Sequence, residues 1–286
     1  MISMKPAILA VLLTLSGFGT PLPSRNRAEP VAVDPGMLVE ASEQSGIEVP
    51  QKPHRPVQRV RSEELSLAEL RAKYPRLFYL RGNPGKRQIA LTFDDAPDPR
   101  FTPQILDILK AQDVKATFFI VGYRAERHPE LVRRMIREGH AVGGHSYDHP
   151  DFSRLSDSRF RDQVLRTNAI LTKLAGYTPN LVRPPYGEIK ESQLIWLGQH
   201  GFYAINWSSD SLDWRNLKAG QVYANVMKSV GPGVIVLQHA GGGRGERLQG
   251  TIQALPQIIR ELKARSYRLV TVPELLNLPD PSRNRD

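Results

Sequence analysis

From about residue 85 onwards, short apolar runs alternate with stretches in which apolar residues recur at helical spacing. The apolar runs predict strands at residues 89–93, 116–121, 141–145, 181–183, 203–207, 234–238 and 269–272. The stretches between them predict helices at residues 102–112, 129–138, 156–174, 192–200, 219–230 and 248–265. Strand–helix alternation repeated this often predicts an α/β domain with a parallel sheet.

Two features favour a closed or nearly closed barrel of about seven strands over a doubly wound sheet. The sequence has no glycine-rich dinucleotide-binding fingerprint after a predicted strand. In addition, side chains suited to catalysis follow the ends of the predicted strands, where active sites of parallel barrels lie. These residues are Asp94, Asp95, His145, Arg183, Asp210, Asp213 and His239.

The segments outside the predicted barrel differ in composition. Residues 1–19 resemble a signal peptide, with an apolar run at 6–15 and small residues before a cleavage site after Gly19; an uncleaved N-terminal anchor is the alternative. Residues 20–84 predict a Pro-rich linker, with a short helix within 66–80. The barrel domain is expected at 85–276 and a polar tail at 277–286. Both interpretations of the start predict a secreted or extracytoplasmic protein.

Composition narrows the chemistry of the chain and of its partners. The 286 residues include no cysteine, which excludes disulfides and thiolate metal sites. The net charge of +10 favours anionic partners, and with the N-terminus it suggests association with the membrane or cell wall. The basic residues are scattered and form no stripe with aromatic residues, so nucleic acid is not the expected partner. We expect a monomer.

Two adjacent carboxylates, Asp94 and Asp95, directly follow the first predicted strand. Side chains of neighbouring strand residues point to opposite faces, but the rule relaxes where a strand ends. The Pro-Asp-Pro at residues 97–99 indicates such an end, so both carboxylates are able to converge. Their repulsion requires a metal ion, a basic side chain or a shared proton nearby. Ordinary turn chemistry is the alternative interpretation.

A pair of histidines provides candidate partners for these carboxylates. His145 and His149 are four residues apart, a spacing that places both on one face of a helical turn. With one carboxylate they would form a three-ligand metal site with open positions, as catalytic metals require. Three other histidines of the predicted barrel are interpreted as structural: His128, His140 and His200.

Three later motifs add functional groups. Arg183 is followed by two prolines, which have no N–H, so the next backbone N–H at Tyr186 has a fixed direction and is able to stabilise an oxyanion. A plain Pro-rich turn is the alternative. Residues 210–214 offer two carboxylates and an aromatic wall, and the buried run at 234–238 leads directly to His239.

Together these five motifs resemble the polysaccharide deacetylase family, also called the NodB homology domain or carbohydrate esterase family 4, over about residues 86–275. The resemblance implies a distorted (β/α) barrel. It also implies removal of acetyl groups from N-acetylated glycans, with acetate as product and a bound divalent metal. Zinc is the expected metal, with cobalt, nickel and manganese as alternatives.

The resemblance assigns a role to each motif residue. Asp95, His145 and His149 match the metal ligands, Asp94 matches the general base, and Arg183 matches the residue that holds the base.

The remaining roles concern the transition state and the substrate. The backbone of Tyr186 matches the oxyanion donor, and His239 matches the general acid, whose pKa is tuned by Asp213. The residues expected to contact substrate are Trp214, Leu237 and Pro185.

Two departures from the family pattern are notable, because Ala96 stands where glycine is usual and Ala240 stands where aspartate is common. Neither removes a ligand or a proton carrier, so an active enzyme is expected. Its expected substrate is an N-acetylglucosamine polymer such as peptidoglycan or a chitin-like glycan. The alternatives are an acetyl-ester hydrolase acting on xylan-like polymers and a catalytically silent carbohydrate-binding protein of the cell envelope.

Overall fold

The computed structural model describes residues 65–243 and 245–283, which belong to one compact unit. The predicted signal peptide at 1–19 and most of the predicted linker lie outside the described residues. Among the described helices, none has both the length and the apolar character that crossing a membrane requires.

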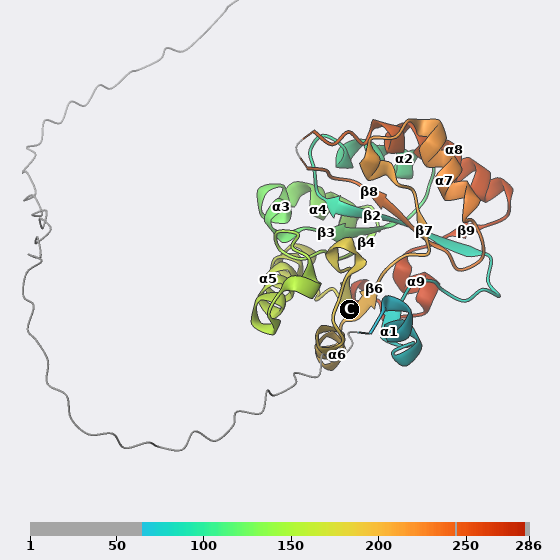
Figure 1. Ribbon diagram of the computed structural model, residues 1–286. Coiled ribbons are helices and arrows are strands. Elements are labelled where there is room, and N and C mark those ends of the chain that lie inside the picture. Colours follow the sequence, from blue (N-terminus) through green and yellow to red (C-terminus); the bar gives the residue numbers. More distant parts are fainter. Residues whose placement is uncertain (1–64, 244, 284–286) are drawn as a thin grey trace, which may run out of the picture. The chain divides into compact units, whose positions relative to one another are not determined.

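A single sheet of nine parallel strands forms the centre of the domain (Figure 1). Its order is β1-β6-β5-β4-β3-β2-β8-β7, with β9 paired to β2. The strands are β1 (Phe78–Tyr79), β2 (Gln88–Ala96), β3 (Thr117–Ile120), β4 (Ala141–Gly144), β5 (Leu181–Val182), β6 (Tyr203–Ile205), β7 (Ser209–Asp210), β8 (Ile235–His239) and β9 (Arg268–Leu269). The predicted distorted (β/α) barrel is confirmed.

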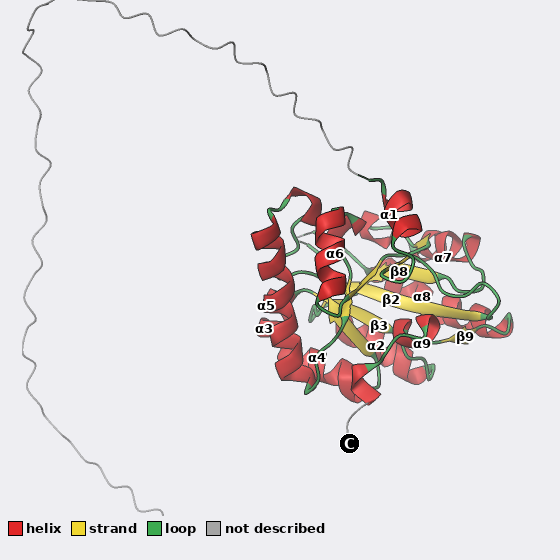
Figure 2. Cartoon of the chain, turned by 90° about the horizontal axis from the view of Figure 1, so that it is seen from below, coloured by secondary structure: helices red, strands yellow, loops and turns green. Residues whose placement is uncertain are grey.

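Helices surround this sheet, as Figure 2 shows from a second direction. They are α1 (Leu67–Lys73), α2 (Thr102–Ala111), α3 (Gly122–Arg127), α4 (Pro129–Arg137), α5 (Asp157–Ala175), α6 (Glu191–Gln199), α7 (Ala219–Lys228), α8 (Gln249–Ala264) and α9 (Val272–Leu276). Four short 3₁₀ helices follow strands or loops: η1 (Phe152–Arg154), η2 (Pro185–Gly187), η3 (Asp213–Arg215) and η4 (Pro281–Arg283).

The seven predicted strands are all present, but the sequence pattern missed two. Strands β1 and β7 have two residues each, too few to show an alternation. The last predicted strand also ends earlier than expected: β9 is Arg268–Leu269, and Val272 begins α9 behind the N-cap Thr271. Helices α3 and α9 were missed for the same reason, because they span only six and five residues.

Strand β2 shows how the apolar pattern builds the core and the site together. Ile89, Leu91 and Phe93 are fully buried in the cluster that includes side chains of α2 and α8. The alternate residues Thr92 and Asp94 contact a different element, the arginine that follows β5. Strand alternation therefore assigns one face of β2 to the helical layer and the other to the polar contacts around this arginine.

Helix α5, the longest, begins and ends where the sequence predicts. The Ser156 hydroxyl accepts a hydrogen bond from the Arg159 N–H, an N-cap interaction. At the other end Gly176 has φ of 75°, a left-handed conformation that glycine adopts without steric cost.

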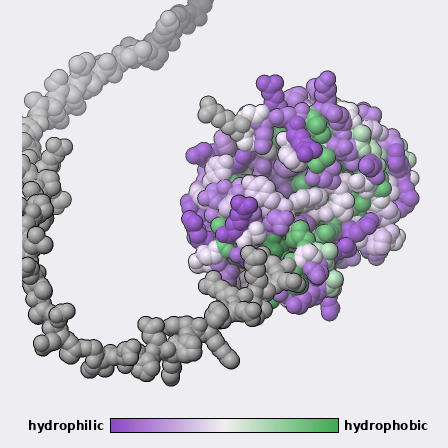
Figure 3. Space-filling view, viewed as in Figure 1, coloured by the Kyte–Doolittle hydropathy of each residue, from purple (hydrophilic) through white to green (hydrophobic). Residues whose placement is uncertain are grey.

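The segment before Gly85 contributes to the fold. Leu70 of α1 and Phe78 of β1 are buried in a second cluster with Leu194 and Leu197 of α6. Strand β1 pairs with β6 at the edge of the sheet. The exact domain boundary remains a prediction. The face of the domain seen in Figure 3 is mostly hydrophilic with small separate hydrophobic areas, as expected when the large apolar side chains are buried.

The aromatic pair Phe93 and Phe118 connects β2 and β3, with ring centroids 5.2 Å apart and both side chains fully buried. We expect Phe118→Ala to lower the free energy of unfolding by about 3–5 kcal/mol, because it removes apolar contacts and leaves a cavity. Leu165→Ala is the control, since Leu165 is 47% exposed and should cost less than about 1 kcal/mol. Urea denaturation of both variants measures these changes. An equal loss of stability in the two would contradict this core assignment.

Candidate active site

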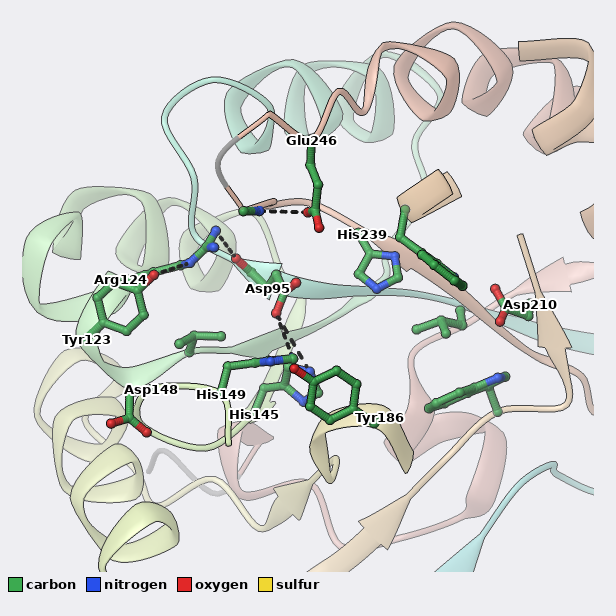
Figure 4. A pocket seen from close by; sticks show the side chains of 15 residues that line it. Asp95, Tyr123, Arg124, His145, Asp148, His149, Tyr186, Asp210, His239 and Glu246 are labelled. Atoms are coloured by element: carbon green, nitrogen blue, oxygen red, sulfur yellow. Dashed lines mark hydrogen bonds and ion pairs between the residues drawn. The ribbon is translucent and has the colours of Figure 1, made fainter. Parts of the chain in front are cut away.

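A pocket of about 560 Å³ opens at the carboxyl ends of the strands (Figure 4). Seven of the eleven residues that the sequence analysis assigned to the site line it: Asp95, His145, His149, Tyr186, Trp214, Leu237 and His239. Arg183, Asp94 and Asp213 are buried beside the pocket: the first two contact His145 and the third contacts His239. Pro185 is also buried but does not line the pocket, so substrate contact by Pro185 stays a prediction.

The two adjacent carboxylates converge through a distortion inside β2. The strand continues to Ala96, past the expected end, and its register with β3 shifts between Phe93 and Ala96. Asp95 has φ of 62°, in the left-handed region. Ordinary strand geometry would turn Asp94 and Asp95 to opposite faces. A bulge with a left-handed residue, and not a strand end, brings them to one site.

Ala96, which stands where the family usually has glycine, does not lie in the pocket. Its side chain is fully buried in the hydrophobic core, and it is not among the residues that line the pocket. Its φ is not positive; the left-handed conformation occurs one residue earlier, at Asp95. The methyl group is therefore accommodated without narrowing the pocket.

Asp94 forms a fully buried ion pair with Arg183. The Arg183 Nη1 donates to Asp94 Oδ1 over 2.7 Å and to the Thr92 hydroxyl over 2.8 Å. The Arg183 Nε donates to the carbonyl of Ile205 over 3.1 Å, and the guanidinium lies 4.0 Å from the centroid of the Phe119 ring. Burial raises the pKa of Asp94, although the charge of Arg183 acts against this.

Asp95, His145 and His149 are arranged as a metal site. Asp95 Oδ1 lies 3.8 Å from His145 Nε2 and 3.4 Å from His149 Nε2. Two ligands that each lie about 2.1 Å from one tetrahedral ion are separated by about 3.4 Å, so these spacings fit a shared divalent cation. All three ligand atoms lie within 4.8 Å of one another. One carboxylate and two imidazoles leave a coordination position open, as in catalytic zinc sites.

The ring orientation of His145 also suits a metal ligand. Its Nδ1 lies 2.7 Å from the carbonyl oxygen of Arg183, so Nδ1 carries the proton and Nε2 presents its lone pair to the site. Burial, assisted by the neighbouring His149, lowers the pKa of His145 to about 3. The imidazole is therefore neutral at physiological pH, the form that binds metals.

The predicted helical turn between the two histidines is wrong. Residues 145–150 form a loop in which Ser146 and His149 have φ of 62° and 65°. The His149 N–H donates to the Ser146 hydroxyl over 2.9 Å. Left-handed residues and this local hydrogen bond bring the rings to a centroid distance of 4.9 Å without a helix.

Tyr186 lies opposite the histidines at the edge of the pocket. It is the second residue of η2, so its backbone N–H has no acceptor within that short helix. Its side chain is 64% exposed and its ring contacts His149 edge to face at 4.9 Å. The arrangement leaves the N–H available to a ligand, and its role as oxyanion donor stays a prediction.

His239 at the end of β8 is held by a buried carboxylate. Asp213 Oδ1 accepts from His239 Nδ1 over 2.7 Å, while Oδ2 accepts from the His239 backbone N–H over 2.9 Å and from the Thr251 hydroxyl over 2.6 Å. Burial disfavours the imidazolium, but the charge and hydrogen bond of Asp213, with Asp95 and Asp94 nearby, outweigh it. They raise the pKa of His239 to about 10.

The outer walls combine predicted and unpredicted residues. Trp214, 44% exposed, and Leu237 line the pocket, and substrate contact by them stays a prediction. Asp210 was noted in the sequence without a role and also lines the pocket. Sequence reasoning also missed these lining residues: Tyr123, Arg124, Asp148, Trp207 and Glu246. Asp148 lies between the two motif histidines but received no role of its own, and the others belong to no motif.

The chain is similar to known proteins over this domain. The family model for polysaccharide deacetylase matches residues 81–205. A peptidoglycan-N-acetylglucosamine deacetylase of Bacillus cereus is 45% identical over 190 residues, which cover 66% of this chain and 68% of the relative.

Solved structures are similar over the same part of the chain. The crystal structure of a peptidoglycan N-acetylglucosamine deacetylase has 43% sequence identity and a TM-score of 0.68, over 70% of this chain and 92% of that protein. A CE4 family pseudoenzyme from Bacillus anthracis has 31% identity and a TM-score of 0.64, over 68% of this chain and 67% of that protein.

The His239–Asp213 pair makes stability depend on pH in a defined direction. The pKa of His239 is raised from 6.5 to about 10, so its contribution is complete below pH 6.5 and is lost as the pH rises through 10. We expect metal-free Asp213→Asn to be less stable than wild type at pH 6, with the difference narrowing towards pH 10. Urea unfolding of both proteins at these two pH values measures it, and a constant difference would contradict the assignment.

Proposed function

Because the chain belongs to the polysaccharide deacetylase family, we propose that it hydrolyses N-acetyl groups of an N-acetylglucosamine polymer, peptidoglycan in the first place. The family assignment made from the five sequence motifs is confirmed, and with it the enzyme class, a hydrolase that deacetylates polysaccharides. The observation that carries the proposal is that His239 and the Asp95–His145–His149 site line one pocket, with Asp94 buried beside it, 3.7 Å from His145 Nε2.

A divalent metal held by Asp95, His145 and His149 would supply Lewis acidity, which polarises the acetyl carbonyl and makes the attacking water more acidic. Zinc is the metal we propose, since the three ligands are one carboxylate and two imidazoles. Cobalt, nickel and manganese are alternatives.

Asp94 is the proposed general base. Its Oδ1 is engaged by Arg183, so Oδ2, which lies 3.7 Å from His145 Nε2, is the oxygen left to accept a proton from water. Burial raises the pKa of this carboxyl and thereby increases its proton affinity. Arg183 keeps the carboxylate in one orientation during the transfer. The Tyr186 N–H is the proposed donor to the oxyanion, aimed by the rigid prolines before it.

His239 is the proposed general acid. An amine leaves an acyl carbon readily only when it is protonated, so a proton donor must lie near the amide nitrogen. The Asp213 carboxylate accepts the Nδ1–H and leaves Nε2–H as the donor. The high pKa keeps the imidazole charged, and a bound divalent cation would offset the nearby Asp95 charge and bring this pKa down towards neutrality.

The proposed setting is outside the cytoplasm, in the cell envelope. The support is the signal-peptide-like start, the Pro-rich segment after it and the net charge of +10. A basic protein is attracted to anionic wall polymers and to lipid headgroups, which would concentrate it near its substrate.

Two rival functions lead to different measurements. An acetyl-ester hydrolase would use the same groups on acetylated xylan, because the chemistry of ester and amide cleavage is shared. A silent carbohydrate-binding protein is the other rival, and a relative described as a pseudoenzyme keeps it in consideration. The retention of ligands, base and acid in one pocket favours an active enzyme.

The division of labour between the two adjacent carboxylates is directly testable. We expect Asp95→Ala to lose both zinc binding and acetate release, because it removes a ligand. Asp94→Asn should keep zinc and lose about 10²- to 10⁴-fold in rate, the usual contribution of a general base. Zinc stoichiometry of the metal-reconstituted protein and acetate release are the readouts.

Asp107→Ala on the exposed surface of α2 serves as the control for carboxylate loss and should match wild type. Unimpaired catalysis in Asp94→Asn would contradict the base assignment. Undiminished zinc binding in Asp95→Ala would contradict the metal site.

A small glycan panel separates the substrate classes. Acetate release from peptidoglycan, chito-oligosaccharides and acetylated xylan should be fastest for peptidoglycan and slowest for xylan. Activity on chito-oligosaccharides with none on wall material would contradict the peptidoglycan proposal. Preference for xylan would establish the esterase, and glycan binding without acetate release from any of the three, in protein supplied with zinc, would establish the silent protein.

A further inference from the structure

An ionic network centred on the buried Asp98, outside the proposed catalytic groups, joins two loops of the pocket. Asp98 lies in the loop after β2 and is only 5% exposed, and its carboxylate accepts from the Arg100 side chain and from the Gly242 N–H. Arg124 of α3 lies 3.5 Å from the same carboxylate. Gly242 belongs to the loop that follows His239, so the network connects the neighbourhoods of the proposed metal ligand and the proposed acid.

The Arg124 side chain connects the two loops of this network (Figure 4). Its Nη1 donates to the backbone carbonyl of Asp95 over 3.0 Å, and its Nη2 donates to the carbonyl of Gly242 over 3.0 Å. Its Nε donates to the Tyr123 hydroxyl over 3.1 Å. Each guanidinium nitrogen thus has an acceptor, so Arg124 is a structural bridge and not a free cation for substrate.

The loop after β8 lies in close contact with Arg124 and with the backbone of Asp95. A methyl group placed at Gly241 would collide with the Asp95 carbonyl and with the Arg124 guanidinium. Only glycine at position 241 lets this loop come so close to the Asp95 backbone. At this separation Arg124 reaches the carbonyls of both Asp95 and Gly242. The Arg124 side chain is therefore long enough to hydrogen-bond to both loops at once.

Asp95 needs such support because of its backbone conformation. With φ of 62° it occupies the left-handed region, which costs a residue with a side chain roughly 1–2 kcal/mol. Relaxation to the strand region would rotate its carboxylate away from His145 and His149. The hydrogen bond from Arg124 to the Asp95 carbonyl opposes that rotation.

We infer that Arg124 is a positioning residue that holds the metal ligand Asp95 in its left-handed conformation and ties it to the loop after the general acid. This inference rests on the proposed metal site. It assigns no contact with substrate to Arg124. The planar fork of arginine reaches several acceptors at once, and the single ammonium of lysine cannot reproduce this geometry.

The test is the zinc affinity of purified protein after chelation, measured by competition with a fluorescent zinc chelator. We expect Arg124→Lys and Arg124→Gln to bind zinc about 10- to 100-fold more weakly than wild type, as loss of a partner that orients a ligand usually does. Arg127→Lys is the matched control, since Arg127 is an exposed arginine of the same helix that lies over the Tyr123 ring, and it should retain wild-type affinity.

A second variant tests the bridge from its other end. Asp98→Asn keeps the size of the side chain and removes its charge, and we expect a zinc affinity between those of wild type and Arg124→Lys. The visible spectrum of the cobalt-substituted protein should shift in the Arg124 variants and not in Arg127→Lys, because only displaced ligands change it. A change of fold stability alone would leave the cobalt spectrum of the folded protein as in wild type.

The outcomes distinguish this inference from the proposed function. Failure of wild type to bind zinc overturns the metal site itself. Tight zinc binding by wild type together with equal affinity and an unchanged cobalt spectrum in Arg124→Lys overturns the positioning role only. Thermal unfolding identifies a variant that has not folded, and if Arg124→Gln is unfolded, the milder Arg124→Lys decides the question.

Discussion

The buried ion pair between Arg183 and Asp94 is the interaction on which the rest of the site depends. A guanidinium that is completely withdrawn from water is costly unless its charge and all its donors are satisfied. Here the carboxylate, the Thr92 hydroxyl and the backbone carbonyls of Ile205, the last residue of β6, and of the next residue accept from it, and the Phe119 ring covers its face. The pair therefore connects β2, β5 and β6 at the catalytic end of the barrel. Arg183 also acts through its backbone, because its carbonyl oxygen accepts from His145 Nδ1 and orients that ring.

Backbone strain in this domain is concentrated around the same place. Of the described residues other than glycine with positive φ, five carry or adjoin proposed functional groups: Asp95, Ser146, His149, Tyr186 and Leu212. Such conformations persist only where surrounding contacts hold them. Asp95 lies in the bulge near the end of β2, and the other four residues follow strands. The regular sheet therefore provides the rigid part, and the bulge and short turns orient the side chains. The arrangement explains why a barrel with ordinary strands converges so many polar groups on one pocket.

The contrast between what the sequence predicted and what it missed follows from this geometry. Long apolar runs such as the one in β2 predicted their strands, because burial of alternate residues leaves a clear periodicity. The candidate ligands were identified from motif and residue type, but their route to the metal site was not: a bulge at Asp95 replaced the expected strand end, and a left-handed loop replaced the helical turn at His145. Arg124 left no signal, since its partners are backbone carbonyls far along the chain, which no local pattern encodes.

Two aspartates of this site show how environment and not residue type sets a role. Asp94 and Asp213 are both buried, and burial alone raises the pKa of a carboxyl group. At Asp94 burial prevails over Arg183, and the pKa is raised, which suits a group that must accept a proton. At Asp213 the His239 charge and the hydrogen bonds from His239 and Thr251 outweigh burial, and the pKa is lowered. Asp213 thus stays ionised and holds the imidazolium, while Asp94 keeps one oxygen for the proton. Opposite pKa shifts in two carboxylates buried beside one pocket fit the roles proposed for them, Asp94 as the base and Asp213 as the partner of the acid.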